Sequence, residues 1–142
     1  MESTKSKYCN CLYHSANAFA RVMTKMADEA FAPTGLSTSY AFLLMTVNES
    51  PGIQPKAISC QMQLTPSTVT RLIEKMEYRG LLERKSKGRA TEVFPTENAL
   101  ALRPVLKTAW QSLYRQYTDI LGKEVADKLT DDIHQAYTMI EQ

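Results

Sequence analysis

Residues 64–80 read LTPSTVTRLIEKMEYRG, and this stretch decides the fold. Thr65 and Pro66 mark a helix start, because a hydroxyl side chain caps a helix and proline suits the first helical position. Apolar residues then recur at positions 69, 72, 73 and 76, which is the spacing of one face of an amphipathic helix. Gly80 is the residue type that commonly ends a helix. The stretch therefore predicts an amphipathic helix that begins at Pro66.

The preceding segment predicts a shorter helix over residues 55–62 and a tight turn at residues 63–65. Two helices joined in this way form a helix-turn-helix, whose second helix enters the major groove of DNA. An ordinary hairpin of two helices in a bundle has nearly the same pattern. The polar face of the second helix favours DNA, since hydroxyl groups contact phosphates or base edges and arginine can bind guanine. The residues of this helix predicted to contact DNA are Pro66, Ser67, Thr68, Thr70, Arg71 and Lys75.

Two short strands are predicted after this helix, over residues 81–84 and 91–94, around the basic tip KSKGRA at residues 85–90. An arginine at such a tip can reach the minor groove, where narrow A·T tracts attract cations. A solvated charged loop is the alternative. Together with the helix-turn-helix, the basic hairpin favours DNA binding. The residues of the hairpin predicted to contact DNA are Arg84, Lys85, Lys87 and Arg89.

The segments LTPSTVTRLIEKMEYRGLLERK (residues 64–85) and KGRATEVFPT (residues 87–96) resemble the winged helix-turn-helix of the MarR (multiple antibiotic resistance regulator) family. The likeness extends over nearly the whole chain. It implies a mainly α fold with a small β-hairpin wing, in which a winged helix-turn-helix is joined to terminal dimerisation helices. Lys87 stands where family members usually carry an aspartate, which makes this wing more basic.

The resemblance implies a single domain over residues 1–142. Residues 36–95 would form the DNA-binding region, and residues 7–31 and 97–142 the helical dimerisation region. Apolar residues recur at helical spacing in both terminal regions, beyond what a small subunit needs for its own core. They either close that core or pair with a second copy, and MarR-like proteins are homodimers through these helices. Two recognition helices about 34 Å apart would read a palindromic operator.

Charge and composition agree with a DNA-binding protein. Residues 54–95 carry eight Lys and Arg against four Glu, whereas the rest of the chain carries nine against eleven acidic residues. A basic segment on a near-neutral scaffold is typical of phosphate binding. No apolar run approaches the ~20 residues of a membrane span, and the N-terminus lacks the apolar core of a signal peptide, so we expect a cytoplasmic protein.

An enzyme is not expected, because the chain has no phosphate-binding glycine loop, nucleophile elbow or pair of metal ligands on a helix. We also expect no cofactor and no metal, since Cys9, Cys11 and His14 fall short of a convergent ligand set. The alternative to a regulator is a winged-helix module that binds another protein without binding DNA.

Two kinds of sensor are suggested by the sequence. Cys9, Cys11 and Tyr13 stand at the predicted start of the first helix, where the helix dipole favours a reactive thiolate. The spacing of Cys9 and Tyr13 is similar to that in the branch of the family that senses organic hydroperoxides. Buried, unreactive cysteines are the alternative.

A small aromatic effector is the second option, because family members often bind such ligands between the dimer helices and the winged region. The residues that could line this pocket are Phe19, Met23, Tyr40, Phe42 and Trp110, and a role in the core is their alternative. The sequence thus predicts a homodimeric regulator of transcription, a repressor, that binds double-stranded DNA and is released by an aromatic effector or by cysteine oxidation.

Overall fold

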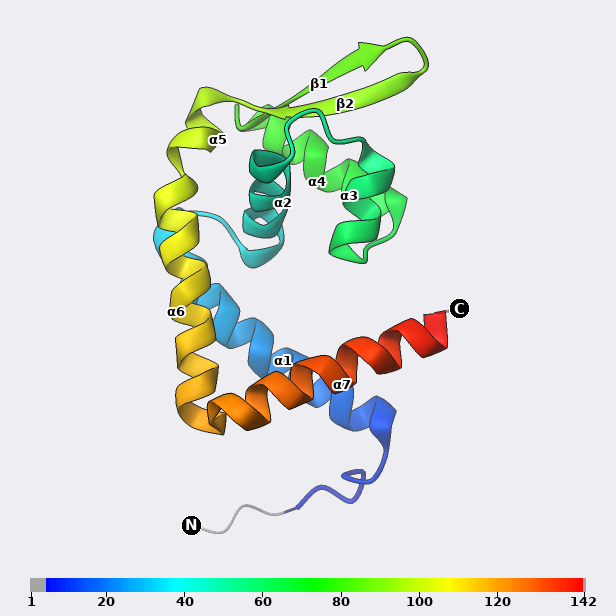
Figure 1. Cartoon of the computed structure of the whole chain (residues 1–142), viewed down its shortest axis with the longest axis vertical. Helices are drawn as coiled ribbons and strands as arrows, with labels where there is room; N and C mark the ends of the chain where they lie inside the picture. Colours follow the sequence, from blue (N-terminus) through cyan, green and yellow to red (C-terminus); the bar gives the residue numbers. More distant parts are fainter. Residues whose placement is uncertain (1–4, 142) are drawn as a thin grey trace.

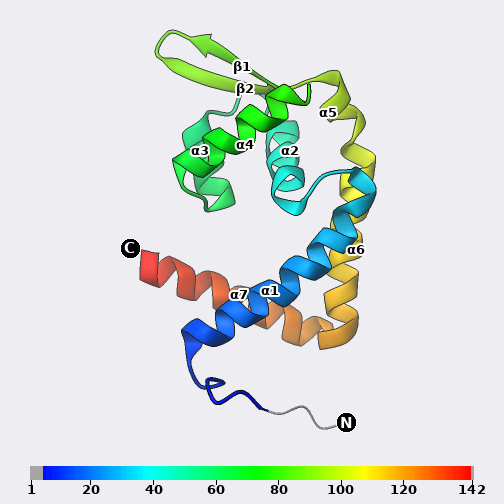
Figure 2. The same ribbon diagram turned by 180° about the vertical axis from the view of Figure 1, so that it is seen from behind.

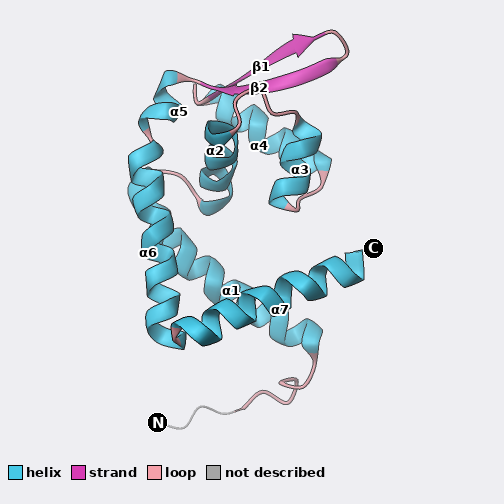
Figure 3. Cartoon of the chain, viewed as in Figure 1, coloured by secondary structure: helices cyan, strands magenta, loops and turns pink. Residues whose placement is uncertain are grey.

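The computed structural model describes residues 5–141, and the terminal residues 1–4 and 142 of the predicted single domain lie outside this part. Most of the chain is helical, and one antiparallel hairpin projects from one end (Figures 1 and 3). The predicted fold class, mainly α with a small β-hairpin wing, is confirmed. The elements are α1 (Leu12–Phe31), η1 (Ala32–Thr34), α2 (Thr38–Glu49), α3 (Pro55–Met62), α4 (Pro66–Tyr78), β1 (Leu82–Lys87), β2 (Ala90–Pro95), α5 (Glu97–Ala101), α6 (Arg103–Leu121) and α7 (Lys123–Glu141).

Helix α2 is the centre of the winged half of the molecule, because it contacts α3, α4, β2 and α6. Its residues Leu43 and Val47 are fully buried, and so are Ile58 of α3 and Val93 of β2. Ile73 of α4 is 1% exposed and completes this apolar centre. Burial of such side chains stabilises the fold by about 1.5–3 kcal/mol each. The core therefore holds the helix-turn-helix and the wing as one unit.

The other half of the molecule consists of α1, α6 and α7 (Figure 2). Helix α1 packs along α6, and α7 turns back from the end of α6 after Gly122. Ala27 of α1 and Ala109 of α6 are buried small residues, which let two helices approach closely. In α7 only Ala126 is buried, so most of that helix is open to solvent. Within residues 5–141, no helix is long and apolar enough to cross a membrane.

The structure shortens two predicted helices. The first was expected from Lys7, but α1 begins at Leu12 because residues 7–10 form turns. After Thr96 a single long helix with a bend at Pro104 was expected, but the structure divides it at Leu102 into α5 and α6. Pro104 explains this break, because proline lacks the N–H that a continuous helix needs and its ring clashes with the preceding turn. It lies in the first turn of α6, where that N–H would have no partner.

The start of α2 is capped from α1. Ser37, the residue before the helix, makes no capping hydrogen bond. Instead the Asp28 carboxylate accepts hydrogen bonds from the Thr38 N–H at 3.3 Å and from the Thr38 hydroxyl at 2.6 Å. Replacing Asp28 by alanine is expected to lower the free energy of unfolding by about 1 kcal/mol, the usual cost of losing a cap. Urea denaturation would measure this, with Glu29→Ala as a control that removes the neighbouring carboxylate; equal stability of the two variants would contradict the cap.

Candidate DNA interface

The start of α4 is built as its sequence predicts. Thr65 is extended (φ −69°, ψ 151°), and its hydroxyl oxygen accepts a hydrogen bond from the Thr68 N–H at 3.4 Å. The Thr65 and Thr68 hydroxyls are also 2.9 Å apart. Gln63 in the preceding turn has a left-handed backbone (φ 55°), which lets the chain reverse direction between α3 and α4. The predicted helix-turn-helix is confirmed.

One face of α4 is buried and the other is free. Val69, Ile73 and Met76 are buried against the core. The residues on this helix that were predicted to contact DNA are all exposed except for Thr68, which is half-buried: Pro66, Ser67, Thr70, Arg71 and Lys75. Tyr78, in the last turn, is 94% exposed and was not predicted as a site residue. The free face therefore offers hydroxyl groups near the helix start and cations farther along.

The wing is longer than predicted. Its strands pair from Leu82 with Pro95 to Lys87 with Ala90, which leaves a turn of two residues, Gly88 and Arg89. Gly88 has φ 62°, a backbone conformation that two-residue hairpin turns require and glycine adopts without strain. Lys85 and Lys87, which the sequence placed in the tip, therefore belong to β1. Arg89 alone of the predicted cations lies at the tip itself.

The predicted cations lie on two faces of the wing. Side chains alternate along a strand and cross-strand partners share a face, so Lys85 and Lys87 lie on one face and Arg84 on the other. The Lys85 ammonium lies 4.9 Å from the centre of the Phe94 ring. Arg84 is paired with Glu77 of α4 at 2.8 Å. Among residues 5–141, the structure shows no ion pair at Lys87 or Arg89, so these two cations remain available.

The base of the wing is held by the turn at Pro51 and Gly52, whose pairing with the wing was not predicted from the sequence. The Gly52 N–H donates to the Val93 carbonyl at 2.8 Å, and the Val93 N–H donates to the Ile53 carbonyl at 2.9 Å. Gly52 has φ 89°, and a side-chain carbon there would lie 3.4 Å from the Phe94 ring. Only the Pro51-Gly52 turn signal pointed to this loop, and it gave no pairing partner.

The sensor cysteines lie outside α1, which corrects the sequence-based expectation. Cys11 is the residue before the helix, and Cys9 lies in a turn two residues earlier. The Ser6 hydroxyl accepts a hydrogen bond from the Tyr8 N–H at 3.1 Å, and local bonds of this kind compete with helix formation. Cys9, Cys11 and Tyr13 are all exposed in the single chain, so neither thiol belongs to the subunit's own core.

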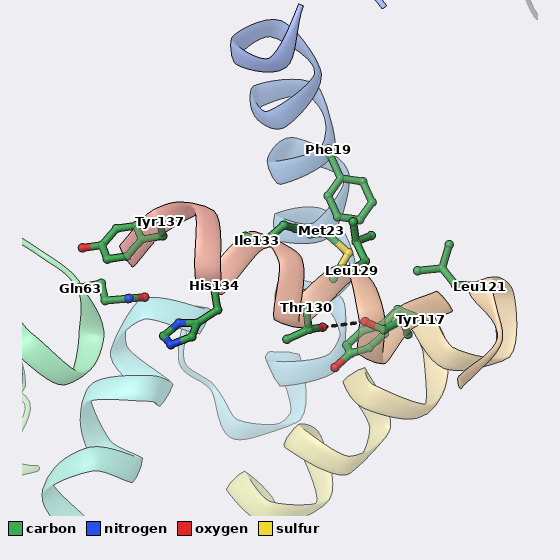
Figure 4. Close-up of a pocket in the computed structure, with 11 residues that line it drawn as sticks. Phe19, Met23, Gln63, Tyr117, Leu121, Leu129, Thr130, Ile133, His134 and Tyr137 are labelled. Atoms are coloured by element: carbon green, nitrogen blue, oxygen red, sulfur yellow. Dashed lines mark hydrogen bonds between the residues drawn. The ribbon is translucent and has the colours of Figure 1, made fainter. Parts of the chain in front are cut away.

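The five predicted effector-pocket residues do not meet in one pocket. Phe19 and Met23 line a hollow of about 400 Å³ between α1, α6 and α7, which we call the α7 hollow (Figure 4). Phe42 and Trp110 line another of about 820 Å³ between α2 and α6, with ring centres 5.4 Å apart. Tyr40 lines neither of these two and packs half-buried against the core. The prediction was wrong because Phe19 and Met23 face α7, whereas Phe42 and Trp110 lie between α2 and α6.

The α7 hollow has an apolar wall and a more polar end. Figure 4 shows Phe19 and Met23 at one side, with Gln63 and His134 at the other. Burial and the neighbouring Tyr114 and Asp127 raise the pKa of Tyr117, which also lines the hollow, so its hydroxyl stays protonated at neutral pH. The structure shows no group of three or more potential metal ligands among residues 5–141.

Comparison with known proteins agrees with a winged helix-turn-helix fold. The sequence profile of the MarR family matches residues 36–88, which include α2, α3, α4 and β1. The PcaV transcriptional regulator of Streptomyces coelicolor, solved with its natural ligand, is 16% identical, with a TM-score of 0.82 over 96% of this chain and 98% of that one. A mutant MarR from E. coli, solved with operator DNA, is 14% identical, with a TM-score of 0.80 over 93% and 99%.

A third similar structure is CouR from Rhodococcus jostii RHA1 bound to p-coumaroyl-CoA, which is 20% identical, with a TM-score of 0.77 over 93% of this chain and 95% of that one. At these identities the likeness shows a shared fold. No curated protein matches this chain in sequence. The fold thus extends over nearly the whole length of each of these regulators.

Proposed function

This chain belongs to the MarR family, and we propose on that premise that it represses transcription as a homodimer bound to a palindromic operator. MarR-family proteins are DNA-binding regulators of transcription and not enzymes. The observation that carries the proposal is that Ser67, Thr70 and Arg71 are exposed on the free face of α4 and that Arg89 is exposed at the tip of the wing. A regulator of this kind works where the chromosome is, so we expect it in the cytoplasm.

The geometry of α4 and the wing supports contact with two neighbouring grooves. Hydroxyl groups and an arginine on a free helix face suit the major groove, where base edges carry a distinct pattern of donors and acceptors. Arg89 at the end of a projecting hairpin suits the narrower minor groove. The DNA complex of the E. coli MarR mutant is a precedent for DNA binding in this fold.

Exposed apolar residues on the terminal helices support the homodimer. In the single chain, many large apolar side chains are exposed to water on helices of the same half of the molecule. Exposed apolar surface of this kind typically marks a protein–protein interface. A second copy of the same helices would cover these side chains through a two-fold interface. The exposed apolar residues concerned are Leu12, Tyr13, Phe19 and Val22 of α1, Ile120 of α6, and Val125, Ile133, Tyr137, Met139 and Ile140 of α7. We therefore propose residues 7–31 and 97–142 as the dimerisation region and 36–95 as the DNA-binding region.

Replacing Arg89 by alanine is expected to weaken binding to all DNA sequences and to lower the slope of log K against log salt by about one unit, because one phosphate contact is lost. If Arg89 instead enters the minor groove, the preference for A·T-rich flanks falls. Fluorescence anisotropy at several salt concentrations measures both. Arg115→Ala, which removes an exposed cation on α6, is the control. Equal affinity and equal slope for the Arg89 variant and the wild type would remove Arg89 from the interface.

Release from DNA is proposed to follow a small aromatic effector or oxidation of an exposed cysteine. Either event would favour a dimer whose recognition helices no longer fit successive grooves. The two hollows, one toward each end of α6, are the candidate effector sites. PcaV and CouR, which share the fold, were solved with ligands bound.

Replacing Cys9 by serine separates the two modes of release. We expect the variant to keep its DNA affinity and its response to aromatic compounds while losing release by organic hydroperoxide, because serine cannot form the sulfenic acid. Anisotropy of the DNA complex before and after oxidant measures this, and Cys60→Ser, which removes an exposed thiol from α3, is the matched control. If hydroperoxide released the Cys9 variant as well as the wild type, Cys9 would not be the sensor.

A further inference from the structure

One ion pair joins the recognition helix to the middle of the wing. The Arg84 guanidinium of β1 lies 2.8 Å from the Glu77 carboxylate in the last turn of α4, and their side chains are 36% and 29% exposed. The negative end of the α4 dipole also favours a cation at this place. Arg84 was predicted from the sequence as a DNA contact, but in the structure its charge is directed at α4.

The wing is anchored at its base and free toward its tip. Leu82 and Val93 are buried, and the Thr96 hydroxyl donates to the Gly80 carbonyl at 2.8 Å. Beyond Arg84, no hydrogen bond or ion pair joins residues 85–91 to a helix in the part of the chain that the structure describes. Among the described residues, the ion pair is therefore the last polar attachment between the helices and the part of the hairpin that projects from them in Figure 1.

The pairing register directs Arg84 toward the helices. Arg84 is paired with the fully buried Val93, and the two side chains share a face of the hairpin. Lys85 and Lys87 lie on the other face. The cations of the wing thus divide by position, since Arg84 is paired with a carboxylate of α4, whereas among residues 5–141 no ion pair is formed by Lys85, Lys87 or Arg89.

We propose that Arg84 is a positioning residue, and that its ion pair with Glu77 sets the direction of the wing tip relative to α4. The proposal rests on the proposed DNA binding, because it concerns how α4 and Arg89 reach two grooves at once. Arg84 acts through the orientation of Arg89 and makes no DNA contact of its own.

The ion pair is important because it lies far from the tip of the wing, so a small rotation at Arg84 moves Arg89 by a larger distance. From Arg84 to Lys87, the last residue of β1, a strand at ~3.3 Å per residue extends about 10 Å, and the turn that holds Arg89 adds about one residue more. A rotation of about 15° at Arg84 would move the tip by about 3 Å, which is comparable to the length of a hydrogen bond. A partly exposed ion pair contributes little to overall stability. Its loss should therefore alter DNA binding more than it alters folding.

The test compares Glu77→Gln, Arg84→Gln and the double variant on a DNA fragment that the wild type binds. The control is Glu74→Gln, which removes the same charge from an exposed position one turn earlier in α4. Charge alone predicts tighter binding for both glutamate variants, because each loses a repulsion from phosphate. We expect Glu74→Gln to bind as well as the wild type or better, and Glu77→Gln to bind about three- to tenfold more weakly.

The salt dependence and the double variant complete the prediction. The salt slope of Arg84→Gln should equal that of the wild type, and the double variant should bind no more weakly than Arg84→Gln, because both changes break one ion pair. The proposal is overturned if Glu77→Gln binds more tightly and Arg84→Gln loses about one unit of salt slope, since Arg84 would then be a phosphate contact.

A measurement without DNA keeps this proposal separate from the proposed function. Residual dipolar couplings of backbone amides report the orientation of the wing relative to α4. We expect the couplings of residues 85–91 to fit the same alignment as α4 in the wild type and in Glu74→Gln, but not in Glu77→Gln. If the wild type binds no DNA while these couplings change as expected, the proposed DNA binding is wrong. The ion pair would still orient the wing as we propose. Unchanged couplings in Glu77→Gln would overturn the ion pair's role.

Discussion

Replacing Ile133 by glutamate is expected to convert the dimer to a monomer and to lower the affinity for an operator with two half-sites by about 100-fold or more. Ile133 lies on α7 and is 52% exposed in the single chain, so the change should be tolerated by the subunit's own fold. In a dimer interface the new carboxylate would be buried without a partner, which costs several kcal/mol. A monomer presents one recognition helix and loses the second half-site.

Analytical ultracentrifugation and anisotropy would measure the two effects of this change. Gln135→Glu is the matched control, because it adds the same charge to the same helix at an exposed position that is not part of the apolar surface. The control should remain dimeric and bind DNA. A wild-type protein that sediments as a monomer, or an Ile133 variant that stays dimeric, would contradict the proposed interface.

Replacing Arg71 by alanine is expected to relax base specificity at one operator position by ~1–3 kcal/mol, the value of a two-hydrogen-bond contact with guanine. Arg71 is exposed on the free face of α4, and no carboxylate pairs with it among the described residues. Its loss should therefore remove an interaction with DNA and leave the fold unchanged. Affinity for the preferred operator should fall by about one to two orders of magnitude.

Anisotropy with operators substituted at each position in turn would locate the base that Arg71 reads. Lys25→Ala, which removes an exposed cation from α1, is the control and should leave the specificity profile unchanged. If Arg71→Ala weakened binding to every sequence equally, Arg71 would contact phosphate and another residue would read the base. Tyr78, exposed on the same helix, would then be the next candidate.

Local signals in the sequence were sufficient for the helix-turn-helix and the wing. The hydroxyl of Thr65, the apolar spacing of α4 and the glycine in the hairpin turn each act within a few residues, so their effects can be read without tertiary structure. The start of α1 was predicted wrongly because two local signals disagree there. The apolar spacing favours a helix from Lys7, whereas the hydrogen bond at Ser6 favours a turn.

Contacts between residues far apart in the sequence could not be predicted from the sequence. The spacing of Phe19 and Phe42 could not show that they would face different hollows, since this depends on which helices lie beside each residue. The partner of Arg84 depends on the path of the chain from α4 into β1, and the pairing of Gly52 with Val93 depends on the loop before α3. Charge and residue type suggest what a side chain can do, whereas the packed fold decides what it meets.

DNA binding by α4 and the wing can be measured by fluorescence anisotropy of the wild-type protein with labelled DNA from its own upstream intergenic region. We expect tight binding that unlabelled random DNA does not displace, with log K falling linearly as log salt rises. Binding of neither this DNA nor a random-site library would contradict it. The winged fold would then serve as a module that binds another protein.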